Sequence, residues 1–510
     1  MERREAFFGL IAPIGINLKD VVDELSQALK KVRYDTNEIK LTDFLGELGC
    51  YDLNYTSEIE RYTKFIDAGD QLCVDSGRRD IFALYGIARL TKNKKREKLD
   101  QLPTEIVHIF RQIKRSEEIT KLEEVFGRNI IYIGCFCPIK KRIAYLVRNM
   151  RKTSRGINKK DLEAKALEII STDEEEKDKP HGQRMVECYP KSDYILDCTT
   201  KGSLRASCER LIEIFFGEPF ISPSVDEYCS YIANAASYRS LDLSRQVGAA
   251  IFSRHCEIIS MGCNEVPKAG GGTYWADPEN DNRDYALGYD SNQRLREDMT
   301  RDALVRLQKD GWLADPYSDL IPDDLVNKAF ALENDVKGPL FGSMIADVIE
   351  YGRMVHAEMN ALADAARFRR STAGATLYCT TMPCHMCTKL IIASGITRVV
   401  FLQPYGKSLV DELFEDSVNL EGNNIKGFVN YDTLVGVTPN GFKRAFHKDK
   451  RRKLPDGTAV SWDPPNAAPI FLSHYQYYQP LEIVAREDLR AARAKVRAKY
   501  AQTALSLDVP

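Results

Sequence analysis

The chain of 510 residues has no excess of charge of either sign, because 72 Lys and Arg are balanced by 74 Asp and Glu and the net charge is −2. A near-neutral chain has no overall field that attracts nucleic acid or an anionic membrane, so any anionic ligand must be held by local groups. No segment reaches the roughly 18 consecutive apolar residues of a membrane span. We therefore expect no membrane partner.

The sequence also lacks the cysteine density of a disulfide scaffold, since its 13 cysteines are odd in number and scattered over a long chain. This usage is typical of reduced thiols, and we expect a cytoplasmic protein. The opening "MERREAFFGLIAPIGINLKD" has a basic start and a short apolar run, but the run continues into a charged helical pattern. We therefore expect a buried strand there and not a signal peptide.

The length favours more than one domain. Residues 1–220 alternate between strand-like and helix-like patterns, which predicts a layered α/β domain with a mostly parallel sheet. The expected strands are 6–15, 105–113 and 129–137, and the expected helices are 17–32, 116–127 and 208–217. The charged passage "STDEEEKDKPHGQR" (171–184) is interpreted as a solvated loop.

The proline-containing "EPFISPS" (218–224) marks the expected boundary, which leaves 221–510 as a second α/β domain. Its polar stretch at about 274–345 is interpreted as an insertion, and its C-terminal extension ends in a charged helix, packed on the outside or on a neighbouring subunit. The expected helices are 225–240, 355–370, 384–394 and 486–502. The expected strands are 246–253, 375–381, 398–404 and the first part of 257–272, which continues into a Gly-rich loop.

Two short motifs carry the residues that are able to bind a metal. "VHAEMNALADAA" (355–366) places His356 and Glu358 at the start of one expected helix, and "MPCHMC" (382–387) places Cys384 and Cys387 at the start of another. Two helix N-termini on the same side of a sheet can surround one ion, and their positive ends favour thiolates.

The count of ligands favours a catalytic metal. His356, Cys384 and Cys387 supply three ligands, whereas a structural zinc is normally closed by four, and a catalytic zinc keeps one position for water. Glu358 is then placed to move protons and not to bind the ion. His385 lies between the cysteines, but at about 100° of helix turn per residue it points away from their face. We therefore expect Zn²⁺ without His385.

These motifs resemble those of the cytidine deaminase superfamily, and within it the deoxycytidylate deaminases. "HAEMNA" (356–361), "MPCHMCTKLIIASGI" (382–396) and "GCNEVPKAGG" (262–271) carry the resemblance, although Cys263 and Glu265 replace a usual tyrosine and glycine. The resemblance implies a three-layer α/β/α domain that deaminates cytosine nucleotides with Zn²⁺. It also implies that Asn264 and Asn360 contact the substrate, and that the backbone near Gly262 approaches it.

The N-terminal half is similar to the degenerate P-loop, kinase-like domain of bacterial antiphage deoxycytidylate deaminases, through "FFGLIAPIGINLKDVV" (7–22) and residues 107–136. The resemblance implies conversion of dCTP or dCMP to the uracil form, which depletes the nucleotide pool of a replicating phage. It also implies a homo-oligomer and regulation by a nucleotide or by an inhibitory small RNA.

The N-terminal loop departs from a working P-loop, which reads G-x-x-x-x-G-K-[ST]. Here Gly15 is followed by Ile16 and Asn17, so the catalytic lysine and hydroxyl are absent, and Gly9 is one residue too far back. One interpretation is a nucleotide or phage-signal sensor that uses backbone N–H groups near Gly9, Gly15 and Asn17. The other is an inherited scaffold. Turnover of ATP is not expected.

Substrate phosphates need nearby cations. Arg245 resembles a family arginine before a strand, and Lys407, with Tyr405 beside it, lies in a glycine-containing loop that opens a helix. Each is equally compatible with an ordinary surface position.

Two alternative functions stay open. A polynucleotide cytosine deaminase would carry basic stripes with stacking aromatics, and no clear stripe is present. A nucleotide sensor with a structural metal site would have no use for Glu358.

Overall fold

The computed structural model divides the chain into two compact units, and each is described by itself. Unit 1 comprises residues 1–228 and 433–510, and unit 2 comprises residues 229–432. The structure describes residues 5–96, 105–154, 156–174, 183–276, 280–330, 332–333, 336–405, 408–448, 452–471 and 478–507. The expected C-terminal extension of the second domain therefore differs from the structure, because residues 433–510 form part of unit 1.

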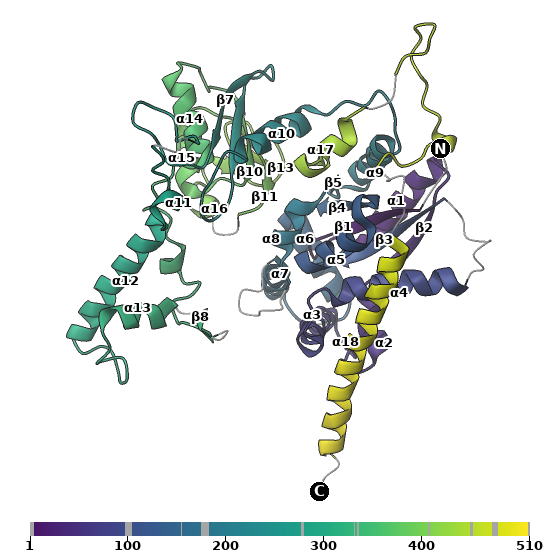
Figure 1. Cartoon of the computed structure of the whole chain (residues 1–510), viewed down its shortest axis with the longest axis horizontal. Helices are drawn as coiled ribbons and strands as arrows, with labels where there is room; N and C mark the ends of the chain where they lie inside the picture. Colours follow the sequence, from purple (N-terminus) through teal and green to yellow (C-terminus); the bar gives the residue numbers. More distant parts are fainter. Residues whose placement is uncertain are drawn as a thin grey trace. The chain divides into compact units, whose positions relative to one another are not determined.

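Unit 1 is built on a six-stranded sheet with the strand order β14-β5-β4-β1-β3-β2 (Figure 1). The strands β1 to β5 pair in parallel, and β14 joins the edge antiparallel to β5. This confirms the predicted α/β class. The strands are β1 (Ala6–Ile11), β2 (Asp35–Lys40), β3 (Ile106–Ile113), β4 (Ile130–Phe136), β5 (Tyr194–Asp197) and β14 (Gly436–Val437).

Helices cover both faces of this sheet, because successive side chains of a strand point to opposite sides. On one face, Phe8 and Leu10 of β1 share a buried core with residues of α1 and α9. On the other, the ring of Phe7 stacks on Phe126 of α5 with centroids 4.0 Å apart. The helices are α1 (Leu18–Lys31), α2 (Asp43–Leu48), α3 (Glu58–Ser76), α4 (Ile81–Arg96), α5 (Ser116–Phe126), α6 (Ile139–Arg151), α7 (Lys159–Glu174), α8 (Met185–Cys188), α9 (Lys201–Phe215), α17 (Pro439–Phe446) and α18 (Tyr478–Leu507).

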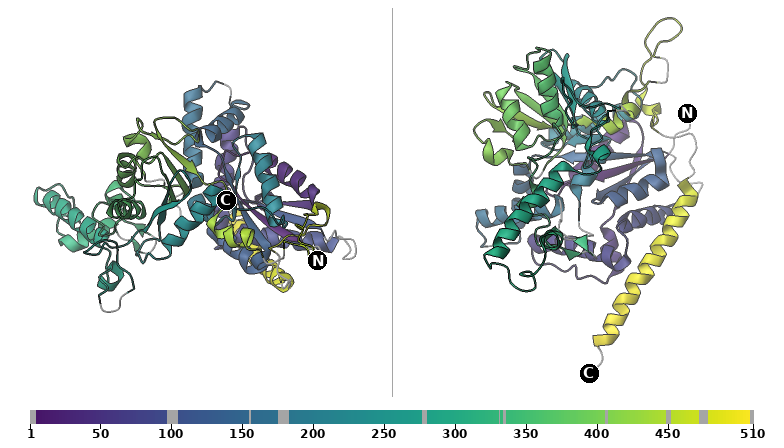
Figure 2. Two further views of the ribbon diagram at one scale, coloured as in Figure 1. Left: turned by 90° about the horizontal axis from the view of Figure 1, so that it is seen from above. Right: turned by 60° about the vertical axis from the view of Figure 1, so that its left-hand side comes forward.

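The C-terminal helix α18 is held against α3 and α4 of unit 1 (Figure 2). The fully buried carboxylate of Asp75 on α3 is its main polar anchor. This carboxylate accepts hydrogen bonds from Tyr500 at 3.0 Å, Tyr51 at 3.1 Å and Gln71 at 2.7 Å, and it pairs with Lys499. The helix predicted at 486–502 thus packs on its own chain.

We expect Asp75→Ala to lower the free energy of unfolding by about 3 kcal/mol, because four donors lose their buried acceptor. Chemical denaturation measures this change. Asp488→Ala is the matched control, since Asp488 forms only a partly exposed pair with Arg78 and should cost less than about 1 kcal/mol. Equal effects of the two substitutions would contradict this account of the anchor.

Unit 2 contains a second six-stranded sheet with the order β12-β13-β11-β10-β6-β7. The pair β10–β11 is parallel, whereas β6 runs antiparallel to both β10 and β7. The strands are β6 (Gly248–Phe252), β7 (Ile258–Cys263), β10 (Thr376–Thr381), β11 (Arg398–Gln403), β12 (Val418–Asn419) and β13 (Val429–Thr433).

Unit 2 has the predicted three layers. Ala249 of β6 faces α14 and α15 in a common core, and the neighbouring Gly248 lies against Ala233 of α10 on the opposite face. The helices are α10 (Val225–Ser237), α14 (Ala357–Arg367), α15 (His385–Ala393) and α16 (Val410–Leu413). In the described part of the chain, no helix is both long and apolar enough to span a membrane.

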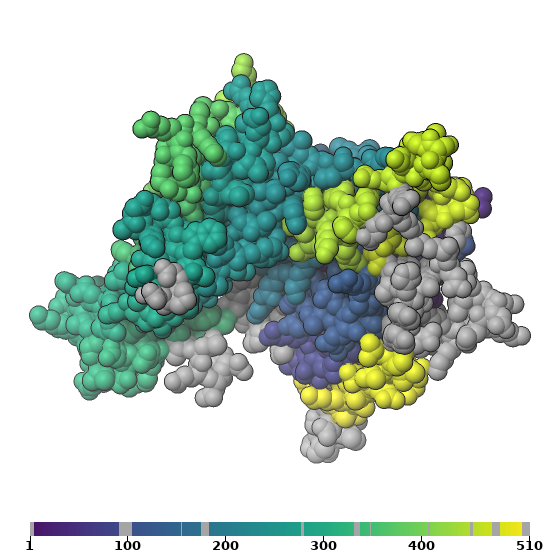
Figure 3. Space-filling view, turned by 45° about the horizontal axis from the view of Figure 1, so that its top comes forward, coloured from purple at the N-terminus to yellow at the C-terminus, as the bar shows by residue number. Residues whose placement is uncertain are grey.

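The stretch expected as an insertion contains three α-helices beside the rest of unit 2 (Figure 1), and the space-filling view shows it as a projecting lobe (Figure 3). Long faces of these helices are solvated, so their sequences are polar and have only a weak apolar periodicity. For this reason the sequence does not predict them as helices. The elements are α11 (Asp284–Leu287), α12 (Ser291–Lys309), α13 (Pro322–Phe330), and the short strands β8 (Leu332–Glu333) and β9 (Val336–Lys337).

Candidate metal centre

The two motifs lie at helix N-termini, as the sequence predicts. His356 is the N-cap of α14, with φ −62° and ψ 155°, and Cys384 is the N-cap of α15, with φ −72° and ψ 167°. Neither side chain caps its own helix, so the imidazole and the thiol are left for other partners. Glu358 and Cys387 follow in the first turns of α14 and α15.

The fold brings His356, Cys384 and Cys387 together. The Nδ1 atom of His356 lies 3.4 Å from Sγ of Cys384 and 3.3 Å from Sγ of Cys387. All three potential ligand atoms lie within 4.8 Å of one another. His385 is not part of this group and faces Glu350, with 3.8 Å between Nε2 and Oε1, as its helical position predicts.

The charges at this centre favour a cation. Hydrogen bonds from Cys387 and His356 lower the pKa of Cys384 to about 4, so its sulfur is held as a thiolate. The same contact with Cys384, together with burial, raises the pKa of Cys387. The thiolate of Cys384 in turn raises the pKa of His356. Two sulfurs and one imidazole nitrogen form a donor set that fits zinc.

Glu358 lies beside the three residues without being one of them. One carboxylate oxygen is 3.5 Å from Sγ of Cys387, and the residue is 4% exposed. Burial raises the pKa of this carboxyl group, because the charged form loses its hydration. A carboxyl group in such a position is able to hold a proton and to release it next to a bound ligand.

Gly262 of β7 allows α14 to lie directly against the sheet. A Cβ atom at this position would be 2.4 Å from the backbone oxygen of Ala357 and 2.5 Å from the backbone nitrogen of Ala361. Ser260 on the same strand donates a hydrogen bond of 2.7 Å to the oxygen of Ala361. The close approach near Gly262 that the sequence predicts for a ligand is therefore made by the backbone of the metal-bearing helix.

We expect Gly262→Ala to displace α14 and to cost about 1–3 kcal/mol of stability, as overpacking does. The same shift moves His356 away from the cysteines, so the bound metal per chain should fall. Elemental analysis of the purified protein measures the metal. Gly46→Ala is the control, because a Cβ atom at Gly46 meets open space. Full metal content in the Gly262→Ala protein would argue against this role.

A cavity of about 200 Å³ opens onto the metal centre. Among the expected substrate contacts, Arg245, Asn264 and Tyr405 line it, and the guanidinium of Arg245 lies 5.2 Å from the ring centroid of Tyr405. The lining residues are Asp242, Ser244, Arg245, Val247, Asn264, Asp290, Asn292, Ile349, Gly352, Met354, His356, Ala357, Glu358, Thr381, Met382, Cys384 and Tyr405.

The two predicted asparagines are engaged by the protein itself. The amide of Asn264 accepts from the backbone nitrogen of Val247 at 2.7 Å and donates to the oxygen of Arg245 at 2.8 Å, so it holds the loop that carries Arg245. Asn360 is not among the lining residues and donates to the oxygen of Cys263 at 2.9 Å. This bond joins α14 to β7. Lys407 lies outside the described residues.

Sequence reasoning missed that the insertion and the segment after it supply part of the cavity wall. Asp290 caps α12 by accepting from the backbone nitrogens of Asn292 and Gln293. The side chain of Asn292 donates to the oxygen of Val348 at 2.8 Å and accepts from the nitrogen of Tyr351 at 3.2 Å. An N-cap pattern at Asp290 was visible in the sequence, but no local signal connects it to a distant site.

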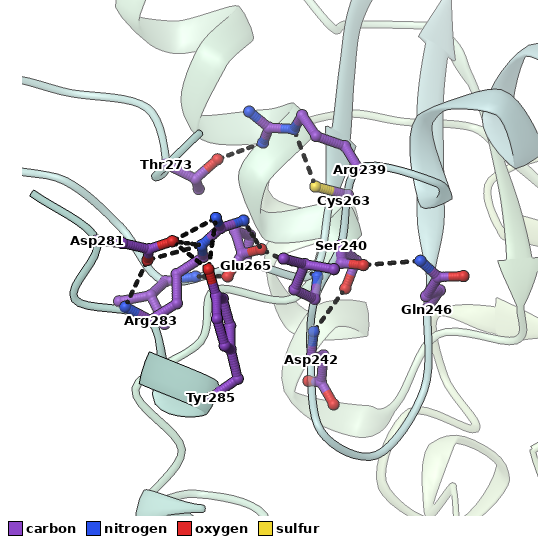
Figure 4. A network of polar contacts seen from close by, with 12 residues as sticks. Arg239, Ser240, Asp242, Gln246, Cys263, Glu265, Thr273, Asp281, Arg283 and Tyr285 are labelled. Carbon is purple, nitrogen blue, oxygen red and sulfur yellow. Dashed lines mark hydrogen bonds and ion pairs between the residues drawn. The ribbon is translucent and has the colours of Figure 1, made fainter. Parts of the chain in front are cut away.

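A network of hydrogen bonds and ion pairs connects the insertion, through Asp281 and Arg283, to Glu265 in the segment after β7 (Figure 4). Glu265, which stands where the resembled family has glycine, is 1% exposed and accepts from the backbone nitrogens of Leu241 at 3.1 Å and Val266 at 2.9 Å. Its other partner is Arg283, which is 3% exposed and also pairs with Asp281. Glu265 thus connects Arg283 of the insertion to the backbone at Leu241 and Val266.

We expect Arg283→Met to lower the free energy of unfolding by about 3 kcal/mol, because Glu265 is left as a buried charge without its cation. Cleavage of residues 281–330 by a protease should become faster at the same time. Arg301→Met is the matched control, since Arg301 pairs with Asp298 and Asp323 at the surface. If both variants unfold alike and resist the protease alike, the network does not anchor the insertion.

The N-terminal loop of unit 1 does not present the three predicted residues to one site. Gly9 lies within β1, where a Cβ atom would be 2.7 Å from the ring of Tyr132. Gly15, at φ +92°, packs against the backbone of Arg142. Asn17 caps α1 through a 3.3 Å hydrogen bond from the nitrogen of Lys19, as the helix prediction requires.

The metal centre lies within a segment that matches the model of a known protein family. Residues 223–403 match the family model described as the cytidine and deoxycytidylate deaminase zinc-binding region. The chain is 46% identical over 54 residues to the deoxycytidylate deaminase of Enterobacteria phage T2 and 41% identical over 66 residues to the ComE operon protein 2 of Bacillus subtilis. These alignments cover 11% and 13% of this chain.

The matches are partial, since the chain spans only 29% of the length of the phage T2 protein and 35% of the Bacillus subtilis protein. A solved structure of the dCMP deaminase from cyanophage S-TIM5 in complex with dCMP and dUMP is 17% identical, with a TM-score of 0.23. That alignment covers 42% of this chain and 100% of the other. The matched family region and the His and Cys group agree on zinc.

Proposed function

We propose that this protein is a zinc-dependent deaminase that hydrolyses deoxycytidine nucleotides to deoxyuridine nucleotides and ammonia. One observation carries the proposal: a buried carboxyl group, Glu358, lies beside a centre to which the described residues supply three metal-binding side chains, and a cavity opens onto this centre. A structural zinc is closed by four ligands and needs no acid beside it. The family region matched by residues 223–403 supports the same chemistry.

His356, Cys384 and Cys387 would hold the zinc ion, which when bound supplies the Lewis acidity that makes water reactive at neutral pH. Glu358 accepts a proton as water adds to C4 of the cytosine. The same carboxyl group delivers this proton to N3, then takes the second proton from the hydroxyl group formed at C4 and passes it to the amino group, so that the C4–N bond breaks, ammonia departs and a carbonyl is left at C4. Its burial keeps bulk water from competing for these protons.

The cavity supports a nucleotide as the substrate. Arg245, held in place by Asn264, presents a cation at the rim, and Tyr405 lies beside it. We infer that this pair faces the sugar–phosphate end of dCMP or dCTP, because a guanidinium is well suited to phosphate oxygens. The insertion, through Asp290 and Asn292, forms part of the cavity wall.

The biological role is proposed from the resemblance of the sequence. Deamination of dCTP or dCMP in the cytoplasm would deplete the pool from which a phage makes DNA, and an antiphage enzyme of this kind would need control. Self-association and regulation by a nucleotide or by an inhibitory small RNA are the forms of control that the resembled family suggests. An enzyme held inactive by such control would need its trigger in the assay.

We expect Glu358→Gln to lower kcat at least about 100-fold while the KM and the bound metal stay near their original values, because the amide keeps the shape but cannot carry the proton. The assay incubates the full-length protein with dCMP, dCTP, CTP or single-stranded DNA and follows uracil products by chromatography. Asp364→Asn, on the outer part of the same helix, is the control.

Deamination of dCMP or dCTP by the unaltered protein and by Asp364→Asn, but not by Glu358→Gln, supports the proposal. Uracil formed only in DNA would make the protein a polynucleotide deaminase. Unchanged activity of Glu358→Gln would remove Glu358 from the chemistry.

A further inference from the structure

The insertion exposes large apolar side chains at its tip, which is the connection between α12 and α13, residues 310–321. α12 extends away from the sheet of unit 2 toward this tip (Figure 1). Trp312 is 77% exposed, Ile321 is 62% exposed and Tyr317 is 48% exposed. Exposed apolar patches often mark a surface that binds a partner, and tryptophan and tyrosine are enriched among the side chains that dominate binding energy.

The tip is held in shape by α12. The side-chain nitrogen of Gln308 donates hydrogen bonds of 2.8 Å to the backbone oxygens of Ser318 and Leu320. The backbone nitrogen of Trp312 donates to the oxygen of Leu307 at 2.9 Å. These bonds hold the connection against the end of α12, so Trp312 is presented to a partner with little further loss of backbone freedom on binding.

The tip is acidic as well as apolar. The segment 310–324 contains no lysine, arginine or histidine, and its aspartates are Asp310, Asp315, Asp319, Asp323 and Asp324. Asp323 pairs with Arg301 of α12. Asp310 and Asp319 are exposed and have no cationic partner among the described residues. A partner of the tip must therefore offer cations around an apolar surface.

A groove between α6 and α7 of unit 1 has this complementary character. Its volume is about 500 Å³. The cations that line it are Lys140, Arg148, Arg151, Lys152 and Lys159. The aliphatic side chains that line it are Ile143, Ala144 and Val147. Glu163 is the one acid among these described lining residues, and it pairs with Lys159 at 3.3 Å. Arg151 is exposed and has no acidic partner in the described part of the chain, so the groove is open to an acidic ligand.

We propose that the tip of one copy of this chain binds in the α6–α7 groove of a second copy. Trp312 then lies against the aliphatic lining, and the aspartates of the tip face the cations of the groove. Opposite charges on the two surfaces favour this pairing over contacts between two tips or two grooves. Because tip and groove are different surfaces, each contact leaves one tip and one groove unused, and further copies add as a ring or a chain.

A strand of nucleic acid is the other ligand that a cationic groove would suit. Proteins that bind single strands combine cations with aromatic side chains on which the bases stack. The described residues that line this groove include aliphatic side chains and no aromatic one. The apolar lining and the acidic tip together therefore favour a second copy of the chain.

Sedimentation velocity of the full-length protein over a range of concentrations measures this association. We expect Trp312→Ala and Arg151→Glu each to raise, about tenfold, the concentration at which half of the copies are associated. One substitution removes the apolar anchor, and the other reverses a charge of the groove. The matched controls should associate like the unaltered protein. They are Trp275→Ala, at a tryptophan that is 66% exposed, and Lys160→Glu, at an exposed lysine of α7 outside the groove lining.

Mixing the two variants tests the pairing itself. The Trp312→Ala protein keeps its groove and the Arg151→Glu protein keeps its tip, so an equal mixture should form pairs joined by one intact contact at a concentration where neither variant associates alone. Melting curves followed by circular dichroism check that each variant is folded.

The proposal is overturned if both variants associate like their controls, or if the mixture associates no better than either variant. It is also overturned if a single-stranded oligonucleotide of about 20 nucleotides binds the unaltered protein but not Arg151→Glu while association of the copies stays unchanged. That result would assign the groove to nucleic acid.

Discussion

The close approach of α14 to β7 at Gly262 is the constraint on which the metal centre depends. The backbone of α14 lies so near the strand that a methyl group at Gly262 would overlap it. Ala357 and Ala361 of α14 share one core with Cys387 and Ile391 of α15. Small residues at these contacts let both helices begin at the same edge of the sheet, and their N-termini carry the histidine and the cysteines.

Three of the buried carboxyl groups among the described residues have different environments, and each environment fixes what the group does. Glu358 has Cys387 beside it, and burial outweighs the nearby His356 and raises the pKa of the Glu358 carboxyl group. Glu265 is paired with Arg283 and holds an element in place. Asp173 is paired with Lys114 and with the backbone N–H of Ile14, and it holds the loop after β1 in place. Whether a buried carboxyl group is suited to chemistry or to stabilising the fold therefore depends on its partner and not on burial alone.

Much of the candidate site was predictable because its signals are local. Each metal-binding residue lies within a few positions of a helix start, and helix capping and periodicity depend on neighbours in the sequence. The ligand set, the exclusion of His385 and the strand that precedes the cysteine motif follow from such neighbours. The α/β class of both units follows in the same way from alternating apolar patterns.

The rest depends on contacts between residues far apart in the sequence. Nothing near Asn360 indicates that its amide bonds Cys263, and nothing near Asp290 indicates a wall of the cavity. Asp173 lies in a charged passage whose composition predicts a solvated loop. Only the folded chain brings Lys114 and Ile14 into contact with it. The sequence of α18 likewise does not indicate that its polar face forms hydrogen bonds with Asp75 of α3. These partners are set by tertiary packing, which overrides local pattern.

The most direct test of the central claim is the metal content of the purified protein together with the X-ray absorption spectrum of the bound metal. The account predicts about one zinc ion per chain, with two sulfur neighbours at about 2.3 Å and lighter nitrogen or oxygen neighbours for the remainder. A protein that binds no zinc when folded, or a zinc ion surrounded by four sulfurs, would contradict the account.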